Sequence, residues 1–254
     1  MRRLPALGFL LLAFSFTVAA QVKSPEPPAV KKPFAESLQA VVVTTPDWPT
    51  VKGTARLFER KTLRAKWTAV GDEFPIVVGR SGLGWAVESA PESAEEFKKE
   101  GDGKAPAGLF PLTFAFGSAP KPEQLGYPYT KLESSTECVD DAASTHYNKI
   151  VDRFKVGIFD WKSSEKMLAV GEEYALGVFV AYNSYPVRSG DGSCIFLHVW
   201  KDAETATSGC TAMERRNVER IVSWLDTARN PYLVQLPAAE YKKLRKKWNL
   251  PKLK

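Results

Sequence analysis

The chain has 254 residues, of which 44% are apolar and 25% are charged, and its formal net charge is +6. This length is enough to bury a sizeable core, and seven tryptophans with fourteen phenylalanines exclude a disordered chain. The basic balance alone is weak support for nucleic-acid binding, and because the chain carries no nucleic-acid-binding motif we expect no such partner.

The N-terminus differs in composition from the rest of the chain. Arg2 and Arg3 precede an almost wholly apolar stretch, and small residues follow it. This pattern predicts a secretory signal peptide over 1–20; a membrane anchor is less favoured because the apolar run is short for a span. Residues 21–33 hold four prolines and predict an extended linker. We therefore expect an exported protein, in the periplasm or the cell wall.

Strand signals dominate the first half of the remaining chain, which we expect to form a single domain over 34–254. β-branched and alternating apolar runs predict strands at 38–45, 54–59, 64–70, 74–80 and 109–114. Their close spacing favours an antiparallel meander. Residues 91–100 are compatible with one or two helical turns, whereas 117–150 is rich in turns and has few periodic signals.

The second half of the chain mixes strands and helices. Apolar runs predict strands at 176–182, 195–200 and 232–236. Apolar residues at helical spacing predict a helix over 213–228. A basic helix is expected at 238–248, and this C-terminus would suit an anionic wall or membrane surface, although a solvated helix face is the simpler interpretation. We predict a mostly β fold, a β-sandwich or meander with a few helices, α+β overall.

Three cysteines give an odd count for an exported protein. One disulfide and one free thiol would account for them. We expect Cys138 to pair with Cys194 and Cys210 to remain free, although the sequence alone leaves the pairing open.

The residues most typical of catalysis are His198 and Cys210. His198 ends an apolar strand-like run, and Cys210 follows it by twelve positions. The segment from Thr211 to Glu214 matches a capping box, which predicts a helix starting directly after Cys210. A helix N-terminus lowers the pKa of a nearby thiol, and an imidazole can accept its proton. We therefore predict Cys210 as a nucleophile and His198 as its base.

The residues around this pair allow a more detailed hypothesis. Gly209 permits close approach of a substrate, and backbone N–H groups around it, with Ser208, would form an oxyanion hole. The alternatives are that Cys210 is a buried apolar residue and that His198 is a core histidine whose ring nitrogens are hydrogen-bonded. The other histidine, His146, lies in a loop with nothing to orient it. Because no ligand spacing is present, we expect no metal and no cofactor.

Four further residues are weaker candidates for binding a substrate. Tyr147 and Asn148 belong to a loop that would line a cleft, although a turn held by a disulfide explains them equally well. Asn183 and Arg188 lie between two predicted strands. Arg188 would hold a carboxylate, but a solvated loop arginine is the simpler interpretation.

The segment around the two catalytic candidates resembles a known family. A histidine at the end of an apolar strand, followed by the loop Thr207-Ser208-Gly209-Cys210, is similar to the catalytic core of the YkuD-type L,D-transpeptidases. These are secreted cysteine enzymes that remodel peptidoglycan. The run Gly-Asp-Gly-Lys-Ala-Pro-Ala-Gly-Leu-Phe at 101–110 resembles the family's Gly-Asp-x-x-Thr-Pro-x-Gly-x-Phe segment. The resemblance covers 38–236 and implies a β fold of the L,D-transpeptidase type.

The resemblance implies a mechanism and a partner. Cys210 would form an acyl-enzyme with a peptidoglycan stem peptide, and transfer to an amine would give a cross-link. Transfer to water would give an L,D-carboxypeptidase or endopeptidase. His198 would be oriented by a backbone carbonyl, here that of Val199.

The chain also departs from the family pattern. Ser208 stands where many members have histidine, Ala212 stands where they have arginine or asparagine, and the twelve-residue spacing is shorter than usual. These departures indicate a divergent branch. Two alternatives therefore stay open: a non-catalytic peptidoglycan-binding module, and a secreted domain in which Cys210 forms a structural disulfide.

Overall fold

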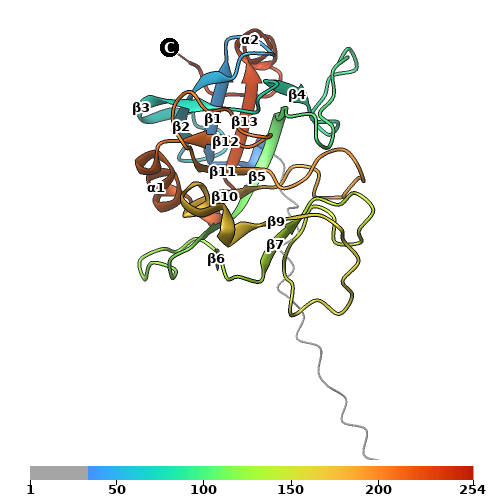
Figure 1. Ribbon diagram of the computed structural model, residues 1–254. Helices are drawn as coiled ribbons and strands as arrows, with labels where there is room; N and C mark the ends of the chain where they lie inside the picture. Colours follow the sequence, from blue (N-terminus) through green and yellow to red (C-terminus); the bar gives the residue numbers. More distant parts are fainter. Residues whose placement is uncertain (1–33, 254) are drawn as a thin grey trace, which may run out of the picture.

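The computed structural model describes residues 34–253. The expected signal peptide (1–20) and linker (21–33) lie outside the described residues. The fold is mostly β, as the sequence predicts. A mixed sheet closes into a barrel, and a small antiparallel sheet lies beside it, below the barrel in the view of Figure 1.

The predicted antiparallel meander is confirmed at the start of the barrel. It consists of β1 (Gln39–Thr45), β2 (Lys52–Glu59) and β3 (Thr68–Val77). β1 is an interior strand, because β2 pairs with one of its edges and β13 (Tyr232–Pro237) with the other, and its side chains are almost all buried. The strands expected at 64–70 and 74–80 are a single strand, which passes through Gly71 at a φ of +64°.

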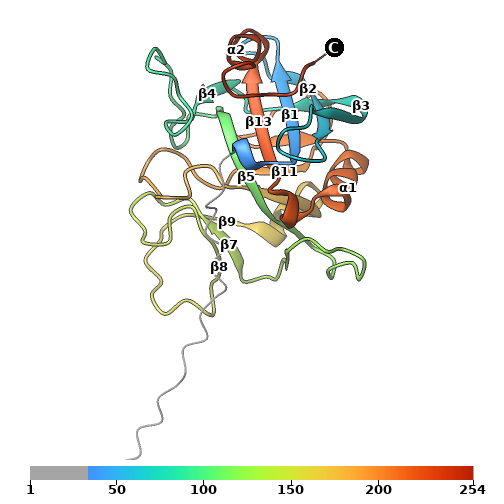
Figure 2. The ribbon, with the colours of Figure 1, turned by 180° about the vertical axis from the view of Figure 1, so that it is seen from behind.

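One long strand joins the two sides of the barrel. β5 (Ala105–Gly117) is more than twice as long as the strand expected at 109–114. Its first part pairs with β13 and its second part with β10 (Leu176–Val180), so the sheet closes on itself. Figure 2 shows β5 crossing the barrel beside β13. Two short strands, β4 (Leu83–Trp85) and β6 (Tyr129–Lys131), pair parallel with the beginning and the end of β5.

The strands that carry the catalytic candidates come next around the barrel. β11 (Phe196–Val199) pairs antiparallel with β10 and parallel with β12 (Thr211–Met213), and β12 continues to β3. The helix expected directly after Cys210 is therefore wrong: residues 211–213 are a buried strand. Their backbone groups are used in sheet pairing, and the helix α1 (Arg215–Trp224) starts only afterwards, without a side-chain cap.

The helices are shorter than the sequence suggests. α1 packs Val218, Ile221 and Val222 inward, as its spacing predicts, but it ends at Trp224 because Leu225 is extended; the 3-10 turn η3 (Thr227–Arg229) follows. α2 (Ala238–Leu244) ends before 248, and the segment after it packs back through a hydrogen bond from the Tyr241 hydroxyl to the Pro251 carbonyl (2.9 Å).

The remaining segments contribute little helix. A 3-10 turn, η1 (Phe34–Glu36), precedes β1. Residues 91–100 form no helix. Within 34–253, no helix has the length and apolarity needed to cross a membrane.

The small sheet arises from a region with few sequence signals. Its strands are β7 (Thr136–Val139), β8 (Ile150–Asp152) and β9 (Ser164–Lys166), and η2 (Met167–Tyr174) leads from β9 back to the barrel.

The predicted Cys138–Cys194 disulfide is confirmed, with a Cα–Cα distance of 6.0 Å, and Cys210 is free. The disulfide therefore ties the small sheet to the segment that precedes β11.

A buried carboxylate holds the small sheet together. Glu137 on β7 accepts hydrogen bonds from the Trp161 indole (2.8 Å) and the Ser164 hydroxyl (2.6 Å), and it pairs with Lys166 at 2.5 Å and Arg153 at 3.3 Å. Burial alone would raise its pKa, but the bonds from Lys166, Ser164 and Trp161 lower the pKa of Glu137 to about 2.

Acid should therefore weaken the fold through Glu137. A carboxylate with a lowered folded-state pKa stabilises the protein above its unfolded pKa and loses that contribution as pH falls toward the folded value. Between pH 7 and pH 3 the wild type should lose about 2 kcal/mol of unfolding free energy more than Glu137→Gln. Denaturant unfolding at both pH values measures this. Equal losses in the two proteins would contradict it.

The disulfide should contribute strongly to stability. It closes a loop spanning 56 residues, and a loop of that length restricts the unfolded chain by about 4 kcal/mol. Cys138→Ser combined with Cys194→Ser should lower the unfolding free energy by an amount of this order. Thermal unfolding of the wild type should respond to reductant and that of the double variant should not. A reductant-insensitive wild type would reject the claim.

Candidate active site

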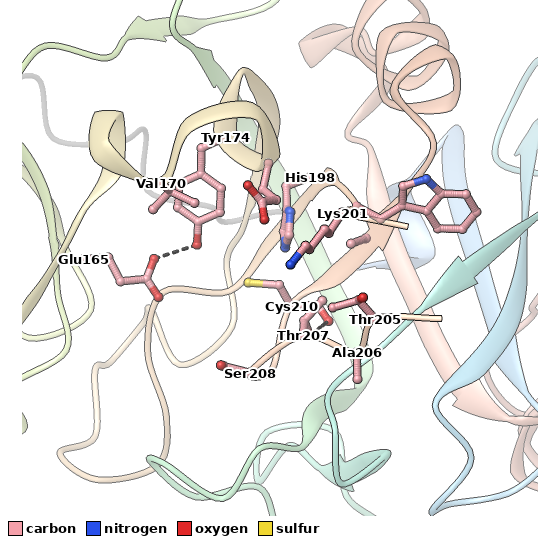
Figure 3. A pocket seen from close by; sticks show the side chains of 13 residues that line it. Glu165, Val170, Tyr174, His198, Lys201, Thr205, Ala206, Thr207, Ser208 and Cys210 are labelled. Carbon is pink, nitrogen blue, oxygen red and sulfur yellow. Dashed lines mark hydrogen bonds between the residues drawn. The ribbon is translucent and has the colours of Figure 1, made fainter. Parts of the chain in front are cut away.

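Cys210 and His198 line the same cleft, which has a volume of about 220 Å³. His198 lies on β11, and Cys210 directly precedes β12, so parallel pairing of the two strands brings the residues together. Segment 205–208 forms one side of the cleft, and β9 with η2 forms the opposite side (Figure 3). The structure thus assembles the predicted pair from neighbouring strands.

The His198 imidazole is fixed by the backbone. Its Nδ1 donates a hydrogen bond to the Val199 carbonyl oxygen at 2.8 Å, as the sequence resemblance implies. A carbonyl only accepts, so Nδ1 carries the proton and Nε2 of the neutral ring is an acceptor. Burial lowers the pKa of His198, although the Val199 carbonyl and Glu173 oppose this effect. The imidazole is therefore in the form that can take up a proton.

The Cys210 thiol is buried, with only 7% of the residue exposed. Its Sγ accepts a hydrogen bond from the Phe196 N–H (3.3 Å) and donates to the Cys194 carbonyl (3.4 Å). Burial and the charge of Glu165 raise the pKa of the thiol well above its usual value. The lowered pKa expected from a helix N-terminus is wrong, because a strand follows Cys210 and the sulfur is shielded from water.

The opposite wall contains a pair that the sequence did not reveal. The Tyr174 hydroxyl donates to Glu165 at 2.6 Å, and the Tyr174 ring packs edge-on against His198 with centroids 5.2 Å apart. In Figure 3 the Cys210 sulfur points toward this side of the cleft. Burial raises the pKa of Glu165 to about 7. Glu165 and Tyr174 lie on the three-residue strand β9 and the irregular 3-10 turn η2, which have no periodic apolar pattern in the sequence. The only cue in the sequence is that Tyr174 is an aromatic residue just before β10.

The predicted oxyanion residues belong to the turn that leads into Cys210. The Gly209 N–H donates to the Thr207 hydroxyl (3.1 Å), which in turn donates to the Cys210 carbonyl (2.7 Å). Ser208 is exposed at the cleft. A Cβ at position 209 would lie 3.1 Å from the Lys104 carbonyl oxygen, so glycine suits this packing. The Gly209 amide would have to exchange its present partner to bind an oxyanion.

Tyr147 and Asn148 lie outside the cleft and make internal contacts. The Tyr147 hydroxyl donates to Glu100 (2.5 Å) and accepts from the Gly192 N–H (3.0 Å). Asn148 accepts the N–H of Cys194 at 2.9 Å, and its amide donates to two backbone carbonyls. Both residues therefore support the segment that carries Cys194.

Asn183 and Arg188 border a second cavity, of about 150 Å³. Arg188 already pairs with Asp191 (2.7 Å) and Glu88 (2.8 Å), and the Asn183 amide donates to the Arg188 carbonyl (2.8 Å). Neither residue lines the cleft of Cys210. Their role in substrate binding stays a prediction, as does that of Tyr147 and Asn148.

The second histidine does not line this cleft. His146 packs edge-on against Trp161 beside the small sheet, and its Nε2 lies 3.1 Å from the Ile158 carbonyl. Across residues 34–253, no group of three or more histidine, cysteine, aspartate and glutamate side chains is arranged to hold a metal ion.

Comparison with known proteins adds a family to this geometry. The model of the L,D-transpeptidase catalytic domain (YkuD) matches residues 50–234, a range that includes both Cys210 and His198. No curated protein and no solved structure matched the chain. Because the family model spans most of the sequence, the chain belongs to the YkuD family of L,D-transpeptidase catalytic domains.

Proposed function

We propose that this protein is a peptidoglycan L,D-transpeptidase with Cys210 as its nucleophile and His198 as its base. The observation that carries the proposal is the shared cleft: a free thiol and a neutral imidazole whose Nε2 can accept a proton line it together, within the range matched by the family. This is the donor–acceptor pair that a cysteine acyltransferase requires.

Acylation would transfer the thiol proton to His198 as Cys210 attacks a peptide carbonyl at an L-to-D junction. A sulfur–carbon bond forms, the carbon–nitrogen bond breaks, and His198 gives its proton to the departing D-amino acid. The Val199 carbonyl and Glu173 both favour the protonated ring. They would therefore stabilise the imidazolium during the step.

The acyl-enzyme would then react with an amine or with water. An amine from a neighbouring stem peptide attacks the thioester, loses a proton to His198 and yields a cross-link. Water in the same position yields a carboxypeptidase or endopeptidase product. The choice depends on which acceptor fills the cleft, and we propose the amine on the basis of family membership.

The thiol is expected to be neutral before substrate binds. Its raised pKa implies little thiolate at neutral pH, and His198 is also neutral. Deprotonation would therefore accompany attack instead of preceding it. The Gly209 amide would have to turn from the Thr207 hydroxyl to the developing oxyanion in the same step.

An extracytoplasmic location is part of the proposal. Disulfides persist in oxidising compartments, and Cys138–Cys194 is such a bond. Peptidoglycan stem peptides are the expected partner of the family. Association of the basic C-terminus with an anionic wall or membrane surface remains a prediction from the sequence.

A non-catalytic peptidoglycan-binding module is the second candidate. The buried thiol with its raised pKa and the occupied Gly209 amide favour it, because a binding module needs neither group to react. Turnover and acylation separate the two candidates.

Replacement of the nucleophile should abolish chemistry and leave the fold intact. Cys210→Ala removes only a sulfur from a buried site, so we expect loss of muropeptide turnover with wall binding retained. Mass spectrometry of muropeptides after incubation, with circular dichroism as the folding control, measures both. A carbapenem should increase the mass of the wild type at Cys210 and leave the variant unchanged. Turnover by Cys210→Ala would refute the assignment, and a wild type that binds but neither turns over nor acylates would favour the binding module.

The two histidines provide a matched comparison for the base. His198→Ala should slow acylation by about 10²–10⁴-fold, since a positioned general base contributes about that much. His146→Ala, remote from the cleft, should leave the rate unchanged. The rate of carbapenem acylation, followed by mass, tests both variants. The reverse pattern would move the base to His146.

A further inference from the structure

The pair formed by Glu165 and Tyr174 has no role in the mechanism described so far. Glu165 is on β9, where it lies opposite Cys138 in the pairing with β7. Tyr174 ends η2 and is buried against Phe196, with ring centroids 5.3 Å apart. Both residues line the cleft with Cys210. Two elements outside the barrel therefore bring an acid and a phenol to the nucleophile.

The Tyr174 hydroxyl has a single proton to donate. It now donates that proton to a Glu165 oxygen at 2.6 Å. In Figure 3 the Cys210 sulfur points toward the side of the cleft that carries Tyr174, and hydrogen bonding with Tyr174 lowers the pKa of Cys210. One O–H cannot donate fully to both groups, so the carboxylate and the thiolate compete for it.

Glu165 forms no ion pair within the part of the chain that the structure describes. Lys166, the neighbouring residue, pairs with Glu137 instead, and among the ion pairs of residues 34–253 none includes Glu165. An uncompensated carboxylate near a sulfur opposes formation of a second negative charge there. Glu165 therefore acts against the thiolate both by its charge and by occupying the phenol.

We propose that Glu165 and Tyr174 are positioning residues that control deprotonation of Cys210. When Glu165 is ionised, it holds the Tyr174 proton and disfavours the thiolate. When Glu165 is protonated or neutralised, the phenol can donate to the sulfur and stabilise the thiolate. The proposal rests on the proposed function only in treating Cys210 as a nucleophile.

Other ionisable groups surround the pair and must be considered in a pH experiment. In the cleft they are His198, Glu173 and Lys201, and outside it Asp140 and Glu100 act on Glu165 and Lys98 acts on Cys210. Burial brings the pKa of Glu165 to about 7, whereas it lowers that of His198. The titration of Glu165 is therefore expected at higher pH than that of His198.

Alkylation of the native protein by iodoacetamide tests the proposal without peptidoglycan. Cys210 is the only free cysteine among the described residues, and the thiolate is the reacting form. In the wild type, the logarithm of the rate should rise with pH and flatten near pH 7, where Glu165 ionises and thiolate formation becomes harder. In Glu165→Gln this inflection should disappear, and the rate above pH 8 should be about tenfold higher, because removal of the nearby negative charge favours the thiolate.

Matched variants separate charge control from loosened packing. Glu172→Gln changes an exposed acid on η2 that does not line the cleft, and it should keep the inflection. Tyr174→Phe removes only the donor, so alkylation below pH 7 should slow several-fold. An inflection that persists in Glu165→Gln, or a uniform rate increase at every pH, overturns the proposal. If Glu165→Gln does not fold, Tyr174→Phe decides: a rate equal to that of the wild type below pH 7 overturns it.

The outcome is independent of the muropeptide assay. A Glu165-dependent inflection in a protein without turnover would support control of the thiol and reject the proposed function. Turnover by the wild type, together with an inflection that persists in Glu165→Gln, would support the proposed function and reject control of the thiol by Glu165.

Discussion

The pairing of β10 with both β5 and β11 is the constraint on which the rest of this structure depends. It closes the sheet into a barrel and makes β11 an interior strand with a partner on each edge. Backbone hydrogen bonds on both edges fix the register of a strand, because a slip of one residue would turn every side chain to the other face. That register sets His198 level with Ala212 and close to Cys210. The catalytic candidates are thus positioned by sheet pairing, since His198 lies on β11 and Cys210 directly precedes β12.

The same closure determines the chemistry of the thiol. A sulfur packed between Phe196, Cys194 and Tyr174 is shielded from water, and burial opposes ionisation far more strongly than one N–H donor assists it. The thiol and the imidazole are therefore both neutral at rest. The reactivity of the site must come from what enters the cleft and from the arrangement of the donors around the sulfur, since a strand follows Cys210 and the thiol is not ionised at rest.

Much of the barrel could be predicted from the sequence because β-branched and alternating runs directly encode buried strands. The meander and the strands around His198 were found in this way. The disulfide was expected from the odd cysteine count, which left the pairing open until the structure confirmed it. The capping-box pattern at Thr211–Glu214 failed because residues 211–213 are more stable between β11 and β3 than at a helix start. Local sequence preferences do not include the pairing of these residues with strands that are distant in the sequence. Glu165 and Tyr174 were missed for a related reason: β9 and η2 are short and irregular, and only the folded chain brings them to the cleft.

The Cys138–Cys194 bond has a consequence for how the site is built. Cys194 contributes the carbonyl that the Cys210 thiol contacts, and Cys138 lies opposite Glu165 in the small sheet. One covalent link therefore joins the segment that contacts the Cys210 sulfur to the small sheet that carries Glu165. Formation of the disulfide is then a step in assembling the candidate active site as well as in stabilising the protein. A chain still in a reducing compartment would have its thiol and imidazole on the barrel, but the wall that faces them would not yet be tethered.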